Sequence, residues 1–331
     1  MRKMNNKFLL SGGITRSFGN FLGTGHGSKF GELAIVDWKT KKIETLIKYK
    51  TDAEFAADVL PSIYFTSASL IGDKLFLCST TQVFVYDYPS LELTLEINHP
   101  WFNDVHHVTC IDQIIYVAST GIDAVLGFDF NGDLVSAQHV DNDDLWFRRS
   151  SSTDYRKIAS TKPHDNHPNF VFELDGQIWA TRFKQKDAVN LSNRAETINL
   201  SDEMVHDGHV KGEYIYFTSV NGHVIQVDKR EKRVIRDYNL NEMDDRGVPL
   251  GWCRGVCIEG DIAYVAFSKL RTTKIEENLR WLKAAIKKEG TNYDVLPARV
   301  SMFDLKQETL LDEFTVPPEH MSIIFSVLRV S

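Results

Sequence analysis

The sequence has few of the features that mark extracellular, membrane or nucleic-acid-binding proteins. It has four cysteines in 331 residues, none of them in a CxxC pair. This argues against a cysteine zinc site and indicates free thiols in a reducing compartment. No run reaches the roughly 18 apolar residues that a transmembrane helix needs, so we expect no membrane span. The formal net charge is -7 and no basic stripe is present, so we expect no nucleic-acid partner.

The amino-terminal stretch is basic but lacks the apolar segment of a secretory signal peptide. Together with the free thiols, this predicts a cytoplasmic protein. Hydrophobic residues make up 43% of the chain, so a large core is available. All-β proteins of this length can still form one domain.

One pattern recurs along the chain, a polar turn followed by a short alternating strand with one aromatic residue. These segments are LIGDKLFLCS, CIDQIIYVAS, ELDGQIWATR, KGEYIYFTS and IEGDIAYVAF. A four-stranded propeller blade takes about 40 to 45 residues, and most of these segments are spaced by a similar length. Gly, Asn and Asp fill the turns, as tight hairpins require.

The two ends of the chain complement each other. Residues 6–13, 31–40 and 42–50 resemble strands two, three and four of a blade whose first strand is missing. Residues 321–330, MSIIFSVLRV, form one unpaired apolar strand that can fill that place. Such closure removes the open sheet edge. We therefore predict an all-β, single-domain, six-bladed β-propeller over residues 1–331; the alternative is a long β-sandwich.

Two insertions interrupt the period. Residues 139–166 form a polar and aromatic loop, which we interpret as either a lid or a disordered segment. Residues 272–290 predict a helix inserted in the last blade, with a capping box at Thr273 and Glu276 and a stop at Gly290. Its apolar stripe fits packing on the blade edge, or docking of a protein partner.

Five residues occupy one equivalent place in the repeat. Counting back by the same offset from each strand aromatic gives Thr66, His106, Asn169, His206 and Arg254. The first strand of each blade lines the central channel, so these side chains should form a ring there. A plain alternative is that polar groups at a channel mouth only bind water.

The residue types favour chemistry on a small anion. Arginine offers a planar fork for carboxylate, sulfate or phosphate, and histidine transfers protons near neutral pH. We expect His106 and His206 to act as acid and base and Arg254 to hold the anion. The expected substrate-binding residues are Asn169, Arg254, Thr66 and Trp252.

The histidines also fit a metal site. His106, His167 and His206 would come from three blades and could hold Mn, Fe, Zn or Cu with an open position for substrate. No short motif such as HExxH supports this. An acidic neighbour could orient each imidazole, and the candidates are Asp104, Asp165 and Asp207; the equal alternative is that each of them forms a turn.

Four segments resemble a bacterial six-bladed propeller-like family of unknown function. They are NDVHHVT, NHPNFVFELDGQIWATR, MVHDGHVKGEYIYFTS and GWCRGVCIEGDIAYVAFSKLR, from about residue 100 onward. The resemblance matches Arg254 to an Arg-Gly motif, and His167 with Asn169 to an HxN motif. It matches His106 and His206 to strand-opening histidines. The chain departs from the family at Val205, where proline is usual, and at residues 207–208, which replace Ser-Pro. The resemblance implies the fold and the ring.

We expect an enzyme of lyase, hydrolase or isomerase type that acts on a small anionic molecule, with or without a metal. The alternative is a non-catalytic propeller that binds or scaffolds a protein or glycan. The support for this alternative is the loop sequence Trp146, Phe147, Arg148 and Arg149. A protein partner could dock on loop 139–166 or on helix 272–290.

Overall fold

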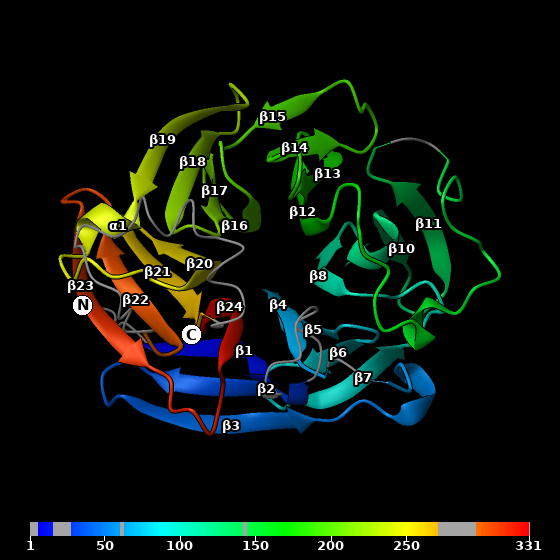
Figure 1. Cartoon of the computed structure of the whole chain (residues 1–331), viewed down its shortest axis with the longest axis horizontal. Coiled ribbons are helices and arrows are strands. Elements are labelled where there is room, and N and C mark those ends of the chain that lie inside the picture. Colours follow the sequence, from blue (N-terminus) through cyan, green and yellow to red (C-terminus); the bar gives the residue numbers. More distant parts are fainter. Residues whose placement is uncertain (1–5, 16–27, 60–62, 142–143, 271–295, 331) are drawn as a thin grey trace.

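A computed structural model describes residues 6–15, 28–59, 63–141, 144–270 and 296–330. These residues form six four-stranded antiparallel sheets arranged in a ring around a common axis (Figure 1). The predicted six-bladed β-propeller is confirmed, and the β-sandwich is excluded. Among the described helices, none is long and apolar enough to cross a membrane.

Blades 1 to 3 occupy the lower and right-hand parts of the ring in Figure 1. Blade 1 consists, from the channel outward, of β24 (Ile323–Val330), β1 (Lys7–Thr15), β2 (Ser28–Asp37) and β3 (Lys42–Tyr49). Blade 2 consists of β4 (Phe65–Ile71), β5 (Lys74–Ser79), β6 (Val83–Asp87) and β7 (Glu92–Ile97). Blade 3 consists of β8 (Val105–Ile111), β9 (Ile114–Ser119), β10 (Ala124–Phe128) and β11 (Leu134–His139).

Blades 4 to 6 complete the ring. Blade 4 consists of β12 (Pro168–Leu174), β13 (Gln177–Arg182), β14 (Asp187–Asn190) and β15 (Thr197–Asn199). Blade 5 consists of β16 (Val205–Lys211), β17 (Tyr214–Ser219), β18 (His223–Asp228) and β19 (Arg233–Asn239). Blade 6 consists of β20 (Trp252–Glu259), β21 (Ile262–Ser268), β22 (Arg299–Asp304) and β23 (Thr309–Thr315). The short helices are η1 (Ala53–Phe55), η2 (Thr120–Ile122), η3 (Tyr155–Lys157) and α1 (Leu240–Met243).

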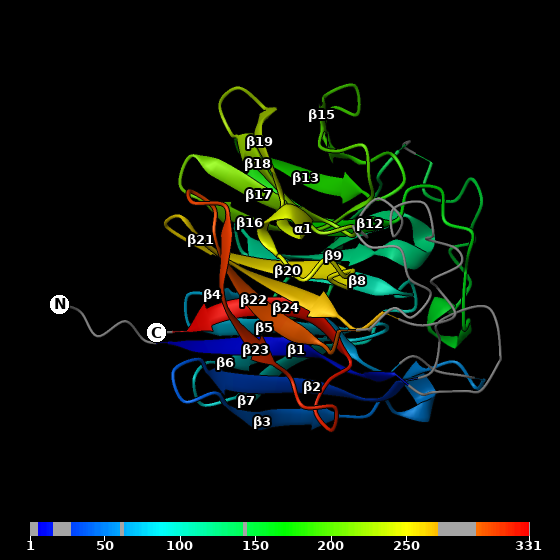
Figure 2. The same cartoon turned by 60° about the vertical axis from the view of Figure 1, so that its left-hand side comes forward.

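The last strand closes the ring as predicted. β24 pairs antiparallel with β1, from Lys7 opposite Val330 to Gly13 opposite Ile323. Figure 2 shows β24 in red beside β1 in blue. This pairing gives blade 1 an innermost strand and leaves β1 with partners on both sides.

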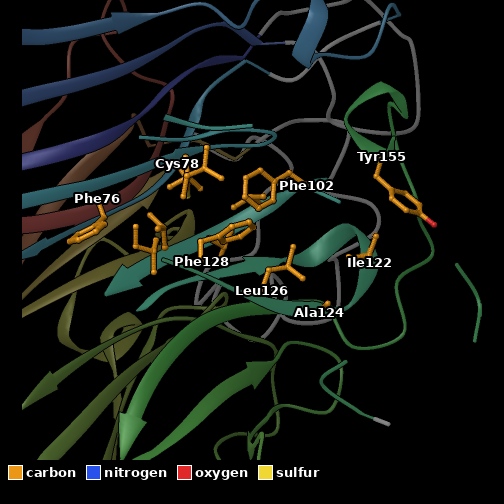
Figure 3. Close-up of a cluster of buried hydrophobic side chains, with 14 of the residues drawn as sticks. Phe76, Cys78, Phe102, Ile122, Ala124, Leu126, Phe128 and Tyr155 are labelled. Atoms are coloured by element: carbon orange, nitrogen blue, oxygen red, sulfur yellow. The ribbon is translucent and has the colours of Figure 1, made fainter. Parts of the chain in front are cut away.

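The core lies in the layers between neighbouring blades. The cluster between blades 2 and 3 packs Phe76, Phe102 and Phe128 against aliphatic side chains (Figure 3). Successive side chains of a strand point to opposite faces of its sheet, so each strand contributes side chains to the layers on both sides of its blade. Tyr155 joins this cluster from loop 139–166, so the loop is anchored on the hydrophobic core.

A bulge in every innermost strand sets the direction of one side chain per blade. In each blade the pairing of the innermost strand with the next strand shifts its register once. The shift lies between residues 65 and 67, 105 and 107, 168 and 171, 205 and 208, 253 and 256, and 324 and 326. A bulge leaves one or two residues outside the regular ladder and turns their side chains. Each of the five bulges in blades 2 to 6 contains one of the predicted ring residues.

The two insertions have different outcomes. In loop 139–166 the structure describes residues 139–141 and 144–166, and Leu145, Tyr155, His164 and Asn166 are buried there. The described part of the loop is therefore packed against the propeller. The predicted helix 272–290 lies outside the described residues.

Candidate functional site

The channel ring has six members, one from each bulge. Five are the predicted residues Thr66, His106, Asn169, His206 and Arg254, and the sixth is Phe325 of β24. Sequence reasoning missed Phe325 because its blade is divided between the chain ends. The signal was present, since Ile-Phe-Ser-Val at 324–327 has the same pattern as Phe-Thr-Ser-Ala at 65–68.

Arg254 lies between an aromatic face and a histidine. Its guanidinium carbon is 4.2 Å from the centre of the Phe325 ring, and Phe325 in turn stacks on Tyr64. Nη1 of Arg254 donates to Nε2 of His206 over 2.6 Å. The stacked contact holds the planar fork in one orientation, as cation–π contacts do.

This hydrogen bond fixes the tautomer of His206. A guanidinium has only donors, so Nε2 of His206 must be the unprotonated nitrogen and Nδ1 must carry the hydrogen. Nδ1 is buried and has no hydrogen-bond partner among the described residues. Burial, and then the charge of Arg254, hold the pKa of His206 well below its usual range. His206 is therefore a neutral imidazole whose buried Nδ1–H is left without a partner among the described residues.

His106 has the same tautomer, but its hydrogen bond uses the other ring nitrogen. Its Nδ1 is 2.7 Å from the backbone carbonyl of Asp104, which can only accept, so Nδ1 carries the hydrogen. The unprotonated nitrogen is therefore Nε2. The His106 ring lies 5.8 Å from the His206 ring and 6.2 Å from the Phe325 ring. Burial lowers the pKa of His106, and the nearby Asp104 opposes this shift.

The other predicted substrate-binding residues differ in what their polar atoms do. Asn169 donates from Nδ2 to the carbonyl of Val205 over 3.3 Å, and its buried Oδ1 has no donor among the described residues. The Thr66 hydroxyl lies 3.3 Å from the backbone carbonyls of Cys78 and Ser79 on the neighbouring strand. Trp252 is half-buried and starts β20, two residues before Arg254.

A second group of side chains with possible ligand atoms lies next to the ring, and two of its members precede a ring residue by two positions in the sequence. Asp104 precedes His106 by two residues, and His167 precedes Asn169 by two. One ligand atom each from Asp104, His164 and His167 lie within 4.8 Å of one another. The His167 ring is 4.9 Å from the His106 ring. Of the metal ligands predicted from sequence, only His167 belongs to this group.

Asp123 holds the segment that carries these histidines. Its carboxylate accepts the backbone N–H groups of residues 165, 166 and 167 over 2.6 to 2.9 Å. Asp123 ends the short helix η2 in a left-handed conformation. Sequence reasoning missed both Asp123 and the place of His164 in the site.

Two of the three acidic neighbours bind partners other than an imidazole. Asp165 pairs with Arg148 on the surface, and Asp207 accepts the N–H of Gly208 over 2.9 Å. Only Asp104 bonds a ring histidine, and it does so through its carbonyl. The carboxylates of Asp165 and Asp207 bind partners in their own loops, and of the two alternatives for Asp207 this favours turn formation over orienting an imidazole.

Histidines next to the ring join neighbouring blades. Nδ1 of His107 accepts the N–H of Val171, and Nδ1 of His209 accepts the N–H of Ile258. Each bond runs from one innermost strand to the next. These two histidines are structural.

The channel widens beyond the ring into a cavity of about 510 Å³. The innermost strands line it with apolar groups such as Phe172 and with charged groups at the far end, where Glu259 pairs with Lys211 and Arg329. Asp207 faces this cavity, and burial raises the pKa of its carboxyl to about 7. The cavity is large enough for a small organic molecule.

Comparison with known proteins supports the fold alone. No family model and no curated protein matches the sequence. A solved protein of unknown function from Bacteroides caccae is similar, with a TM-score of 0.61 and 10% identity, over 98% of this chain and 100% of that one. A chain of a nidogen/laminin complex is similar with a TM-score of 0.56 and 8% identity, over 97% of each chain. At such identities the likeness establishes a propeller and leaves the activity to be argued from the site.

Proposed function

We propose that the protein is an enzyme of lyase or isomerase type that removes a proton from a small anionic substrate in the channel. The observation that carries this proposal is that the His106 and His206 rings lie 5.8 Å apart and use different nitrogens for their hydrogen bonds. His106 donates from Nδ1 to Asp104, which leaves its Nε2 lone pair, and His206 accepts from Arg254 at Nε2, which leaves its Nδ1–H. One imidazole offers a lone pair and the other an N–H. Proton abstraction next to a carbonyl or carboxylate needs both.

Arg254 binds the anionic group of the substrate. Its fork is held against Phe325, so a carboxylate or phosphate can bind to it in a fixed orientation. Asn169 supplies further polar contact on the same ring through its buried Oδ1.

The chemical step uses the two histidines in different roles. Nε2 of His106 takes a proton from the carbon next to the carbonyl, and the C–H electrons move onto the carbonyl oxygen. Nδ1–H of His206 donates to that oxygen as its charge develops, and a neutral imidazole does so without itself losing a proton. A general base and one oxyanion donor each contribute about 10² to 10³ or more in rate.

We also infer kinship with the bacterial propeller family that the sequence resembles. Support comes from the residues that the resemblance implies, because His106, His206 and Arg254 adjoin one another on the channel ring. The metal ligand set predicted from sequence, His106, His167 and His206, also stays a proposal.

Hydrogen exchange tests the proposed chemistry. Small 2-oxo and 2-hydroxy carboxylates and malonate are incubated with the protein in D₂O, and loss of the C–H signal is followed by proton NMR. We expect enzyme-dependent exchange that falls about 10²- to 10⁴-fold in His106→Gln. The control is Arg329→Gln, which removes an arginine from the far end of the same channel. Exchange unchanged in His106→Gln would refute the assigned base.

Anion binding is tested separately. Malonate, sulfate and phosphate should raise the melting temperature of the wild type and of Arg329→Gln, and should leave Arg254→Gln unchanged. An equal rise in Arg254→Gln would place the anion elsewhere.

A scaffold function is the second candidate, and one residue favours it. Phe147 is 75% exposed in the described part of loop 139–166, next to Arg148. An aromatic residue so exposed fits contact with a protein or glycan. Binding of a partner that Phe147→Ala abolishes and His106→Gln leaves intact would favour this function over the enzyme.

A further inference from the structure

Three side chains outside the ring are placed to bind a metal ion. We propose that Asp104, His164 and His167 bind one divalent first-row transition metal ion in octahedral geometry, with positions left open toward the channel. Their ligand atoms lie within 4.8 Å of one another. Two imidazoles and one carboxylate form the donor set typical of Mn, Fe and Co sites with open positions. This inference does not depend on the proposed function.

The distance between the two histidines fits the geometry of such a site. Nδ1 of His164 is 2.8 Å from Nδ1 of His167. For a metal ion about 2.1 Å from each nitrogen, the angle between the two metal–nitrogen bonds would be about 84°. That is close to the 90° of octahedral neighbours and well below the tetrahedral angle.

Two hydrogen bonds of the Thr161 hydroxyl set the tautomer of His164. The Thr161 hydroxyl donates to Oδ1 of Asn103 over 3.1 Å, so its oxygen must accept from Nε2–H of His164, also at 3.1 Å. Nδ1 of His164 then carries the lone pair and accepts the Nδ1–H of His167. A metal ion between the two nitrogens would replace that hydrogen, and His167 would then keep its hydrogen on Nε2. Hydrogen-bond partners like Thr161 are common behind metal-binding histidines, where they fix the ring and its tautomer.

The backbone holds the cluster in place before any ion binds. Asp104 and His167 both have left-handed backbone conformations, with φ of 49° and 61°. Such conformations cost about 1 kcal/mol or more in residues with side chains, and they persist where surrounding contacts impose them. Here three N–H groups bound to the Asp123 carboxylate impose the path of residues 165–167.

The cluster borders a small cavity on one side and the channel ring on the other. A small cavity of about 30 Å³ borders Asp104 and His164, which is the space of about one water molecule. On the other side the His167 ring adjoins His106 of the channel ring. Water or a substrate oxygen could occupy the remaining positions of the ion.

Cobalt titration tests the site in the whole protein purified without a histidine tag. Co²⁺ is added to protein freed of metal, and its visible absorption and binding heat are recorded. We expect one ion per chain. The affinity should fall at least about 100-fold in His164→Ala and His167→Ala, and about tenfold or more in Asp104→Asn. His223→Ala is the matched control, because it removes a histidine that pairs with Asp237 on the surface of blade 5.

The outcomes separate this site from its alternatives. Circular dichroism shows whether each variant is folded, and Asp104→Asn keeps the size and shape of the side chain if a histidine variant unfolds. Binding that survives in folded His164→Ala, or that is lost in His206→Ala alone, would overturn the assignment. Absence of binding to folded wild type at millimolar Co²⁺ would also overturn it. Because the readout is spectroscopic, a failed exchange assay would leave this test unaffected.

Discussion

Replacing Asp207 with asparagine should make the stability of the protein less dependent on pH. The carboxyl lies on the bulge next to His206 and faces the channel cavity. Burial raises its pKa to about 7, although the Gly208 N–H and the charge of Arg254 act in the opposite direction. The nearby thiols of Cys78 and Cys253 stay protonated over this range, because burial raises their pKa values.

The sign follows from comparing the folded and unfolded chains. In the unfolded chain the carboxyl ionises near pH 3.8, whereas in the folded chain it holds its proton up to about pH 7. The wild type therefore loses stability as pH rises from about 4 to 7, by about 4 kcal/mol if the shift is fully expressed. Between pH 5 and pH 8 only the part of this change above pH 5 counts, so we expect a loss of about 2 to 3 kcal/mol.

Urea denaturation of both proteins between pH 5 and pH 8 measures this effect. The difference in unfolding free energy between Asp207→Asn and the wild type should grow with pH in favour of the variant. Taking the difference cancels the titration of groups that both proteins share. Asp165→Asn is the control whose difference from the wild type should stay constant over this range, because Arg148 lowers the pKa of the Asp165 carboxyl and the group is ionised in both the folded and the unfolded chain above pH 5. A constant difference for Asp207→Asn across the range would refute the buried, protonated state of Asp207.

Three further predictions concern packing and closure. Gly121→Ala should destabilise the fold by about 2 kcal/mol in urea denaturation, because the added carbon would lie 2.7 Å from Cβ of Asn103. An unchanged denaturation midpoint would show that Asn103 can move away without cost. Arg299→Met should lower the free energy of unfolding by about 3 kcal/mol in the same assay, because it removes the buried ion pair of Arg299 with Glu313 at 2.7 Å. A variant as stable as the wild type would show that this pair contributes little. Deletion of residues 321–331 should abolish cooperative thermal unfolding followed by circular dichroism, because blade 1 then lacks its innermost strand, and a sharp transition would contradict the role of closure.

The ring could be predicted from the sequence because the bulge recurs at a constant place. Each blade from the second to the sixth keeps its innermost strand and the next strand adjacent in the chain, so one offset finds the turned side chain. Phe325 escaped the count because β24 and β1 are at opposite ends of the chain. Only the pattern of the strand itself could have identified it.

The second group of ligands could be predicted only in part. His167 was found because it precedes a ring residue in the strand, which is a local relation. His164 reaches the group through a loop whose path depends on Asp123 and Asn103. Such contacts join residues from different turns and leave no periodic signal. For the same reason the sequence did not show that Asp165 turns outward to Arg148.

The pairing of β24 with β1 sets an order of events during translation. The ribosome makes β24 after every other described strand, so the ring stays open while the rest of the propeller emerges. Phe325, the aromatic platform under Arg254, is made with that strand. The contact between Phe325 and Arg254 thus forms only when the ring of blades closes, and a nascent chain stalled before residue 321 would have five complete blades and no such contact.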